Sequence, residues 1–328
     1  MNKWVGLLLV QIILIALFST PSRAEDLVNR QDKVWQPEEE AIQIPIWPKE
    51  PPSSSLLGRV NESYGFGKKQ IAGRPFTIVE HVSQPTMSIF HAKGKDTGNT
   101  IVVFPGGGYR VLAIDLEGTE VCTWLTIKGI TCVLLKYRVP GSGPYWSDEC
   151  NCRRIPAQPT ALQDAQRTVA LLRTRAAELG INPHKIGVLG FSAGGHLVAD
   201  ISNHEKLSYK SIDAVDQESS RPDFAIALYP GHLWKKPGLT LNPPIKIASN
   251  CPRTLIISAS DDPIDDVRNS IAYYDALQQA NIPVEMHLYS RGGHAFGVRG
   301  TSDAVTHWPE VAEKWLNSIG VLKSDANE

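Results

Sequence analysis

Short apolar runs alternate with longer amphipathic segments from about residue 76 onward. Several of the short runs are apolar at successive positions, which is typical of strands covered on both faces. The expected strands are Phe76–His81, Met87–His91, Thr100–Phe104, Gly129–Tyr137, Lys185–Gly190, Asp223–Tyr229, Thr254–Ser258 and Val284–Tyr289.

The longer segments have the spacing of amphipathic helices. In one of them apolar residues from Leu162 to Ala176 fall on a single stripe, and Gly180 follows as a helix-ending residue. The expected helices are Leu116–Lys128, Thr160–Leu179, Ala193–Asn203, Asp266–Ala280 and Pro309–Ile319. Strands that alternate with helices in this way predict an α/β fold with a mostly parallel central sheet and helices on both faces.

The N-terminus has the pattern of a cleavable secretory signal. Lys3 precedes an apolar run from Trp4 to Phe18, and small residues lead to a cleavage position after Ala24. The run is shorter than the roughly 20 residues that a membrane-spanning helix needs, although an uncleaved anchor is the alternative. We expect a signal peptide over residues 1–24, a secreted or periplasmic protein, and no stable membrane association after cleavage.

The remaining chain divides by composition into an arm and a body. Residues 25–60 are rich in Pro, Glu and Ser and predict an extended arm, and apolar residues between Ile42 and Trp47 suggest that the arm lies on the body. Residues 61–328 form one large domain by the usual size of domains. The irregular segments at 140–156, 205–221 and 231–252 are expected to surround the carboxyl ends of the strands, where open α/β sheets bind ligands.

Charge and cysteine content restrict the possible partners. Lys and Arg total 33 and Asp and Glu total 34, so no basic face predicts binding to nucleic acid. Five cysteines are too few for a disulfide-built scaffold, and their odd number leaves at least one unpaired within the chain. Export would allow one or two disulfides, and the sequence leaves their pairing open. Cys122 and Cys132 lie in apolar sequence and are expected to be buried small hydrophobic residues rather than metal ligands. Cys150 and Cys152 lack a second pair at zinc spacing, so no metal site is predicted.

The strongest chemical motif surrounds Ser192. An apolar strand leads directly into the Gly190-Phe-Ser192-Ala-Gly194 motif, and a helical segment leads directly out of it. This is the context of a nucleophile elbow, in which a sharp turn exposes the serine hydroxyl above the sheet. Glycine is needed on both sides because a side chain would collide across the turn.

A glycine run and the elbow together predict an oxyanion-binding site. Gly106, Gly107 and Gly108 follow the expected strand Thr100–Phe104. Acyl transfer places negative charge on a carbonyl oxygen, and two fixed backbone N–H groups can stabilise it. We expect one donor from Ala193 and the other from Gly107 or Gly108.

The base and the acid are expected after the last two strands. His294 lies between glycines beyond the strand Val284–Tyr289 and is the candidate general base. In the order Ser, Asp, His, the acid should follow the strand Thr254–Ser258. Asp262, which precedes a proline, is preferred to Asp261 as that acid, and Asp261 would then cap the turn. Asp265 and Asp266 are expected to cap the following helix. This chemistry requires neither a metal nor an organic cofactor.

The chain resembles secreted α/β-hydrolase esterases, the group described as acetyl xylan esterases or lipase/esterase-like proteins. The resemblance covers about residues 41 to 320, and Pro105 departs from it because many more distant relatives have His before the glycines. The matching stretches begin at Ile44, Phe104, Leu135, Asp164, Gly187 and Gly292. The resemblance implies an α/β-hydrolase fold with a Ser192–Asp262–His294 triad.

The resemblance also implies a substrate class. Such enzymes cleave short acyl esters, often acetyl groups on polysaccharides, and exposed aromatic residues stack on the sugars. Candidate stacking residues are Tyr109, Tyr145, Trp146 and Trp234, and simple packing explains each of them equally well. The expected function is a serine esterase that deacetylates a small acyl ester or an acetylated saccharide. The alternatives are an amidase, arylformamidase or peptidase with the same triad, and a non-catalytic binding protein on this scaffold.

Overall fold

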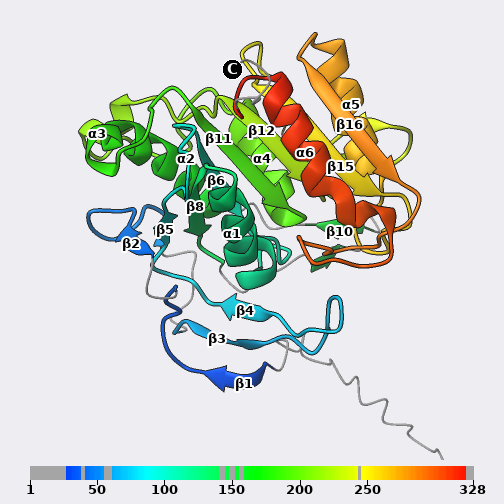
Figure 1. Cartoon of the computed structure of the whole chain (residues 1–328), viewed down its shortest axis with the longest axis horizontal. Helices are drawn as coiled ribbons and strands as arrows, with labels where there is room; N and C mark the ends of the chain where they lie inside the picture. The colour runs from blue at the N-terminus through cyan, green and yellow to red at the C-terminus, as the bar shows by residue number, and fades with distance from the viewer. Residues whose placement is uncertain are drawn as a thin grey trace, which may run out of the picture.

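A mixed sheet forms the centre of the protein in the computed structural model, which describes residues 27–37, 41–54, 61–139, 145–147, 152–154, 159–242 and 245–322. In these ranges eight strands lie side by side. In spatial order they are β16 (Val284–Tyr289), β15 (Arg253–Ala259), β12 (Phe224–Leu228), β11 (Ile186–Phe191), β6 (Thr100–Phe104), β8 (Thr131–Lys136), β5 (Thr86–Phe90) and β2 (Ile42–Pro45). All neighbours from β16 to β8 are parallel, whereas β5 is antiparallel to β8 and to β2. The predicted mostly parallel sheet is confirmed (Figure 1).

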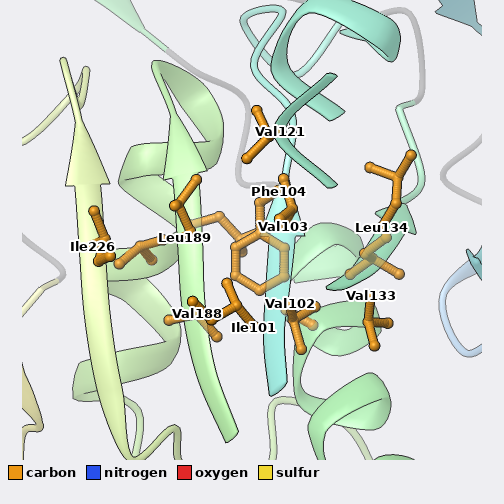
Figure 2. Close-up of a cluster of buried hydrophobic side chains, with 14 of the residues drawn as sticks. Ile101, Val102, Val103, Phe104, Val121, Val133, Leu134, Val188, Leu189 and Ile226 are labelled. Carbon is orange, nitrogen blue, oxygen red and sulfur yellow. The ribbon is translucent and has the colours of Figure 1, made fainter. Parts of the chain in front are cut away.

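The middle strands carry apolar residues at successive positions because both of their faces are covered. Val102 of β6 pairs with Val188 of β11, and Val103 pairs with Leu189. Every residue of β6, β8 and β11 is buried. Figure 2 shows apolar side chains of these strands gathered around Phe104. Burial of this kind is the main force that holds the sheet together.

Helices cover both faces of the sheet (Figure 1). The helices are α1 (Glu120–Ile127), α2 (Pro159–Thr174), α3 (Ala176–Leu179), α4 (Ala193–Asn203), α5 (Arg268–Gln279) and α6 (Trp308–Ser318). The rings of Trp124 on α1 and Trp308 on α6 lie 5.1 Å apart on one face. On the other face Ala199 of α4 shares a core cluster with Leu277 of α5. Among the described residues no helix combines the length and apolar character that a membrane crossing needs.

Two of the expected helices are interrupted. The helix expected at Thr160–Leu179 divides into α2 and α3, and the left-handed conformation of Gly180 ends it as predicted. The helix expected at Leu116–Lys128 begins as a π-helical turn, Asp115–Thr119, that leads into α1.

A second, antiparallel sheet lies beside the first, in the order β1 (Val28–Gln31), β3 (Ser63–Phe66), β4 (Thr77–Glu80) and β7 (Val111–Ala113). The strand expected at Phe76–His81 belongs to this sheet as β4 rather than to the central one. The pattern of the sequence did not predict β1, β3 and β7, which are three or four residues long. The smaller elements are the hairpins β9 (Tyr145–Ser147) with β10 (Cys152–Arg154) and β13 (Trp234–Lys235) with β14 (Thr240–Leu241), and the 3-10 turns Ala214–Gln217 and Ala304–His307.

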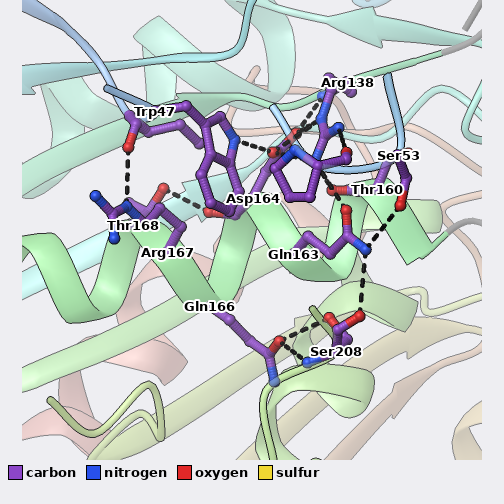
Figure 3. Close-up of polar contacts among 12 residues, drawn as sticks. Trp47, Ser53, Arg138, Thr160, Gln163, Asp164, Gln166, Arg167, Thr168 and Ser208 are labelled. Carbon is purple, nitrogen blue, oxygen red and sulfur yellow. Dashed lines mark hydrogen bonds and ion pairs between the residues drawn. The ribbon is translucent and has the colours of Figure 1, made fainter. Parts of the chain in front are cut away.

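The N-terminal arm is joined to the body by its own strand and by a buried polar network. Ile46 and Trp47 follow β2 and are buried. Trp47 Nε1 donates a 2.7 Å hydrogen bond to Asp164 Oδ1 on α2, and Arg138 Nε donates to both oxygens of the same carboxylate at 2.9 Å (Figure 3). The arm therefore lies on the body in its described part, as its apolar residues predict.

Cys122 and Cys132 are buried as expected, and the structure defines the pairing that the sequence left open. Cys122 on α1 and Cys132 on β8 form a disulfide. Apolar sequence cannot distinguish two buried thiols from a buried disulfide, because both avoid water. Cys251 is a free, buried thiol. Cys150 and the side chain of Cys152 lie outside the described part of the chain.

Candidate active site

Ser192 occupies the sharp turn between β11 and α4. Its backbone angles are φ 52° and ψ −116°, which a residue with a side chain rarely adopts. A Cβ at Gly190 would lie 2.2 Å from Gly194 O, and a Cβ at Gly194 would lie 2.0 Å from Phe104 O. Both glycines are therefore required by close backbone approach, as the sequence predicts. The turn lifts the hydroxyl group to the carboxyl edge of the sheet.

Two side chains from later strands extend a chain of hydrogen bonds from Ser192. His294 follows β16, and its Nε2 lies 3.0 Å from Ser192 Oγ. The other ring nitrogen, Nδ1, lies 2.7 Å from Asp262 Oδ2, and the Asp262 side chain is only 1% exposed. Asp261 points elsewhere and accepts a 2.8 Å hydrogen bond from Gly293 N. The structure thus brings Asp262 to the imidazole, while Asp261 holds the loop that carries it.

The surroundings of His294 favour its protonated form. Burial by itself lowers its pKa, but the hydrogen bond to Asp262 and the negative charges of Asp262, Asp265 and Glu117 outweigh burial and raise the pKa above the usual value. The Tyr229 ring packs edge-on against the imidazole, with 4.9 Å between the ring centroids. An imidazole held in this way can take a proton from Ser192 and keep the positive charge that results.

The glycine loop after β6 lies against the elbow. A Cβ at Gly106 would be only 3.0 Å from Ser192 Cβ. Gly107 (φ 134°) and Gly108 (φ 62°) adopt backbone angles that favour glycine, and Gly107 O accepts a 3.0 Å hydrogen bond from Arg110 N. The structure therefore places the predicted donors Gly107 and Gly108 on a tight turn beside the serine, and Ala193 at the first position of α4.

Glu117 is part of the site although no motif indicated it. Its Oε2 accepts a 2.7 Å hydrogen bond from Gly106 N, and its Oε1 accepts one of 2.7 Å from the Tyr229 hydroxyl. Burial raises the pKa of this carboxyl group, against the lowering effect of these hydrogen bonds. Glu117 joins the glycine loop to the residue that packs on His294. Its sequence surroundings, Asp115 to Glu120, are polar and carry no signal of this role.

Asp265 also reaches the site, and its predicted role as a helix cap is wrong. Its Oδ2 lies 3.1 Å from Ser192 Oγ and 3.9 Å from His294 Nε2. Asp266 does occupy the expected place, because its Oδ1 accepts a 3.0 Å hydrogen bond from Arg268 N at the start of α5. The two acids are adjacent in sequence, and only the course of the turn separates their roles.

The structure describes the side chains of two of the expected stacking residues, Tyr109 and Trp234. Tyr109 is only 3% exposed, and its hydroxyl lies 2.8 Å from His196 Nδ1, so its burial contradicts the prediction of an exposed platform. The glycine loop ends in a buried turn, which draws this ring into the core. Trp234 is partly buried, and the Arg268 guanidinium lies 3.8 Å from its ring centroid. Tyr145 and Trp146 belong to β9, but their side chains lie outside the described part.

Among the described residues no three His, Cys, Asp or Glu side chains are placed to hold a metal ion.

Comparisons with known proteins agree with this geometry. Residues 147–229 match the model of the BD-FAE family. The chain is similar to an acetylxylan esterase of Xylanibacter ruminicola, with 30% identity over 253 residues, or 70% of this chain and 48% of that protein. The chain thus spans about half the length of this relative.

Solved structures extend the likeness. An acetyl ester-xyloside bifunctional hydrolase from Caldicellulosiruptor lactoaceticus is 27% identical, with a TM-score of 0.64 over 86% of this chain and 97% of that one. The α/β hydrolase MGS-M1, from a Medee basin deep-sea metagenome library, is 24% identical, with a TM-score of 0.56 over 72% of this chain and 93% of that one. The chain has the α/β-hydrolase fold. As in other α/β hydrolases, the three linked side chains follow separate parallel strands, here β11, β15 and β16, and meet at their carboxyl ends.

Proposed function

We propose that this α/β hydrolase is a serine carboxylic-ester hydrolase that removes short acyl groups, acetyl in particular, from xylan-like carbohydrate. The observation that carries the proposal is the linked chain of Ser192 Oγ, His294 Nε2 at 3.0 Å and Asp262 Oδ2 at 2.7 Å from His294 Nδ1. Similarity to an acetylxylan esterase and to an acetyl ester-xyloside hydrolase supports the choice of bond and substrate.

The reaction proceeds in two balanced halves. Ser192 Oγ attacks the ester carbonyl carbon while His294 takes the hydroxyl proton. The tetrahedral intermediate then expels the alcohol, which receives that proton, and leaves an acyl group on Ser192. Water attacks the acyl-enzyme in the same way, with His294 as base, and releases the carboxylic acid and the free serine. Asp262 orients the imidazole and stabilises its positive charge.

The developing oxyanion is bound by backbone N–H groups. Ala193 at the start of α4 supplies one donor, and Gly107 or Gly108 on the glycine loop supplies the other. These donors are fixed before the substrate arrives, because Glu117 holds Gly106 N and the elbow is closely packed. Fixed donors of this type contribute about 3–4 kcal/mol each to transition-state stability.

We further propose export of the protein after removal of residues 1–24, with no stable membrane association and no nucleic-acid partner. The disulfide between Cys122 and Cys132 supports export, because such bonds persist in oxidising compartments. Mass spectrometry of protein recovered from a bacterial host's periplasm or medium should find an N-terminus at Glu25. Recovery of the intact leader would contradict this proposal.

The decisive experiment compares the wild type with Ser192→Ala on p-nitrophenyl acetate and on acetylated xylan. The variant should lose at least about 10⁴-fold in kcat on both, because the nucleophile is removed while the fold remains. A fluorophosphonate probe should label the wild type and not the variant. Unchanged hydrolysis by Ser192→Ala would defeat the proposal.

The same assay separates the bond types. N-formyl anilides and peptides offered beside the acetyl esters test whether an amide is preferred. We expect higher kcat/KM on the esters, and a preference for either amide substrate would replace the esterase proposal with an amidase or peptidase.

A further inference from the structure

A second carboxylate lies beside the nucleophile. Asp265 Oδ2 is 3.1 Å from Ser192 Oγ and 3.9 Å from His294 Nε2, and the side chain is 11% exposed. The proton relay proposed above uses one carboxylate, Asp262, on the far nitrogen of the imidazole. Asp265 lies close to the other imidazole nitrogen, Nε2, beside the reacting atoms. The proton relay gives it no role there.

The fold holds this carboxylate in place from two sides. The Asp265 backbone N–H donates a 3.0 Å hydrogen bond to Asp262 Oδ1, which ties its position to the acid of the relay. On the other side, a Cβ at Gly231 would lie 2.6 Å from Asp265 Oδ1. Gly231 N in turn donates to Ser192 O at 3.3 Å. The Asp265 carboxylate therefore fits beside the Ser192 hydroxyl group because residue 231 is a glycine.

Asp265 lies where the alcohol part of a bound ester is expected. During the first half-reaction the acyl carbon is bonded to Ser192 Oγ, and the departing oxygen must lie within reach of His294 Nε2 to receive its proton. Atoms next to that oxygen consequently lie near Asp265 Oδ2, which is 3.9 Å from the same nitrogen. An ionised carboxylate accepts hydrogen bonds from hydroxyl groups and repels anions.

We infer that Asp265 determines specificity by accepting a hydrogen bond from the free hydroxyl group next to the esterified oxygen of a carbohydrate. The enzyme then selects sugar esters with a free vicinal hydroxyl over esters that lack one. This inference rests on the proposed esterase function and adds the feature of the substrate that the site recognises.

The same contact affects activation of the nucleophile. The Ser192 hydroxyl has one proton, and two acceptors, His294 Nε2 at 3.0 Å and Asp265 Oδ2 at 3.1 Å, compete for it. A substrate hydroxyl that donates to Asp265 occupies this competing acceptor and leaves the serine proton directed to His294. A substrate without that hydroxyl leaves the competition in place.

The test compares Asp265→Ala with the matched control Asp266→Ala. Asp266 is the adjacent acid, and its carboxylate bonds Arg268 at the start of α5 rather than the site. Three substrates are used at a pH well above the usual imidazole range. They are methyl 2-O-acetyl-xylopyranoside, its 3-O-methyl derivative without the vicinal hydroxyl, and p-nitrophenyl acetate.

The wild type should prefer the free-hydroxyl sugar to its methylated derivative by about 10- to 100-fold in kcat/KM, as expected for a hydrogen bond to a charged group. Asp265→Ala should abolish that preference, so that the two sugars are hydrolysed with the same kcat/KM. Asp266→Ala should behave as the wild type. Asp265→Asn, which keeps the shape and one acceptor oxygen, should retain part of the preference, and it decides the question if the alanine variant does not fold.

Two results would overturn the inference. One is an equal loss of activity on all three substrates in the Asp265 variants, which would make the residue a general part of the site. The other is a preference between the two sugars that is the same in the Asp265 variants as in the wild type. A wild type that hydrolyses none of the three esters would instead defeat the proposed function itself, so the two failures are distinguishable.

Discussion

Two buried carboxylates in this protein have opposite kinds of partner. Asp262 pairs with His294, a group that gains and loses a proton near neutral pH, and the imidazole is 10% exposed. Asp164 pairs with Arg138, which stays charged at any ordinary pH, and both side chains are fully buried. Asp164 also binds Trp47 of the arm, as Figure 3 shows.

The difference shows how similar chemistry serves two purposes. A relay needs a partner that exchanges protons and an opening to the substrate. A structural link needs a partner whose charge never changes, and complete burial with several hydrogen bonds to offset the cost of removing both charges from water. The pair near Ser192 should thus govern activity, and the pair at the arm should govern stability.

The largest expected effect is on activity. Asp262→Asn should lower kcat on p-nitrophenyl acetate by about 10⁴-fold, because the amide no longer holds the imidazole in the required tautomer. Asp261→Asn is the control and should retain most of the activity, since Asp261 contacts Gly293 N and not the ring. Steady-state kinetics on both variants measure the difference. A larger loss in the Asp261 variant would reassign the acid of the relay.

The second effect is on stability. Arg138→Met should lower the free energy of unfolding by about 3–5 kcal/mol, because it leaves the buried charge of Asp164 without its main partner. Denaturant unfolding measures the change, and kcat of the remaining folded protein should stay near the wild-type value. Arg175→Met is the control and should change the midpoint little, since its pair with Glu178 lies at the surface. Equal stability of the two variants would remove the distinction between the pairs.

The third effect is a pH dependence of activity, which we expect from the pair of Asp262 and His294 and not from the pair of Asp164 and Arg138. His294 acts as a base only when neutral, and its pKa is raised by Asp262, Asp265 and Glu117 against the opposing effect of burial. Activity should therefore fall as the pH drops through a value above about 6.5, the usual pKa of imidazole. A pH profile of kcat/KM measures the midpoint, with circular dichroism to show that the fold persists. A midpoint well below that value would mean that the carboxylates do not control the imidazole.

The smallest effect concerns Glu117. Glu117→Gln should lower kcat by about tenfold, because the amide can no longer accept hydrogen bonds at both ends, from Gly106 N and from the Tyr229 hydroxyl. Loss of this charge should also move the acid limb of the pH profile to lower pH, since Glu117 raises the pKa of His294. A merely structural role would reduce activity without moving the limb.

Much of this architecture could be predicted from local patterns in the chain. All eight segments that the sequence predicts as strands contain a strand in the structure, and the helix expected at Ala193–Asn203 has those bounds. The turn at Ser192 could be predicted because its glycines report a backbone constraint that arises within a few residues. The order of motifs along the chain also placed Ser192, Asp262 and His294 after separate strands, and the structure brings them together.

Other features depended on contacts between distant segments. The strand Thr77–Glu80 belongs to the smaller sheet rather than to the central one. Cys122 on α1 forms a disulfide with Cys132 on β8. No local signal separated Asp265 from Asp266, although one of them reaches Ser192 and the other remains at the helix.

The sequence by itself determined the elements, their order and the residues able to perform acyl transfer, because periodicity and glycine positions record burial and backbone limits over short distances. Only the tertiary structure decided which carboxylates surround His294 and which aromatic side chains stay accessible. Those outcomes depend on how strands and loops pack across separations such as the 73 residues between Ser192 and Asp265, and no short-range pattern encodes that packing.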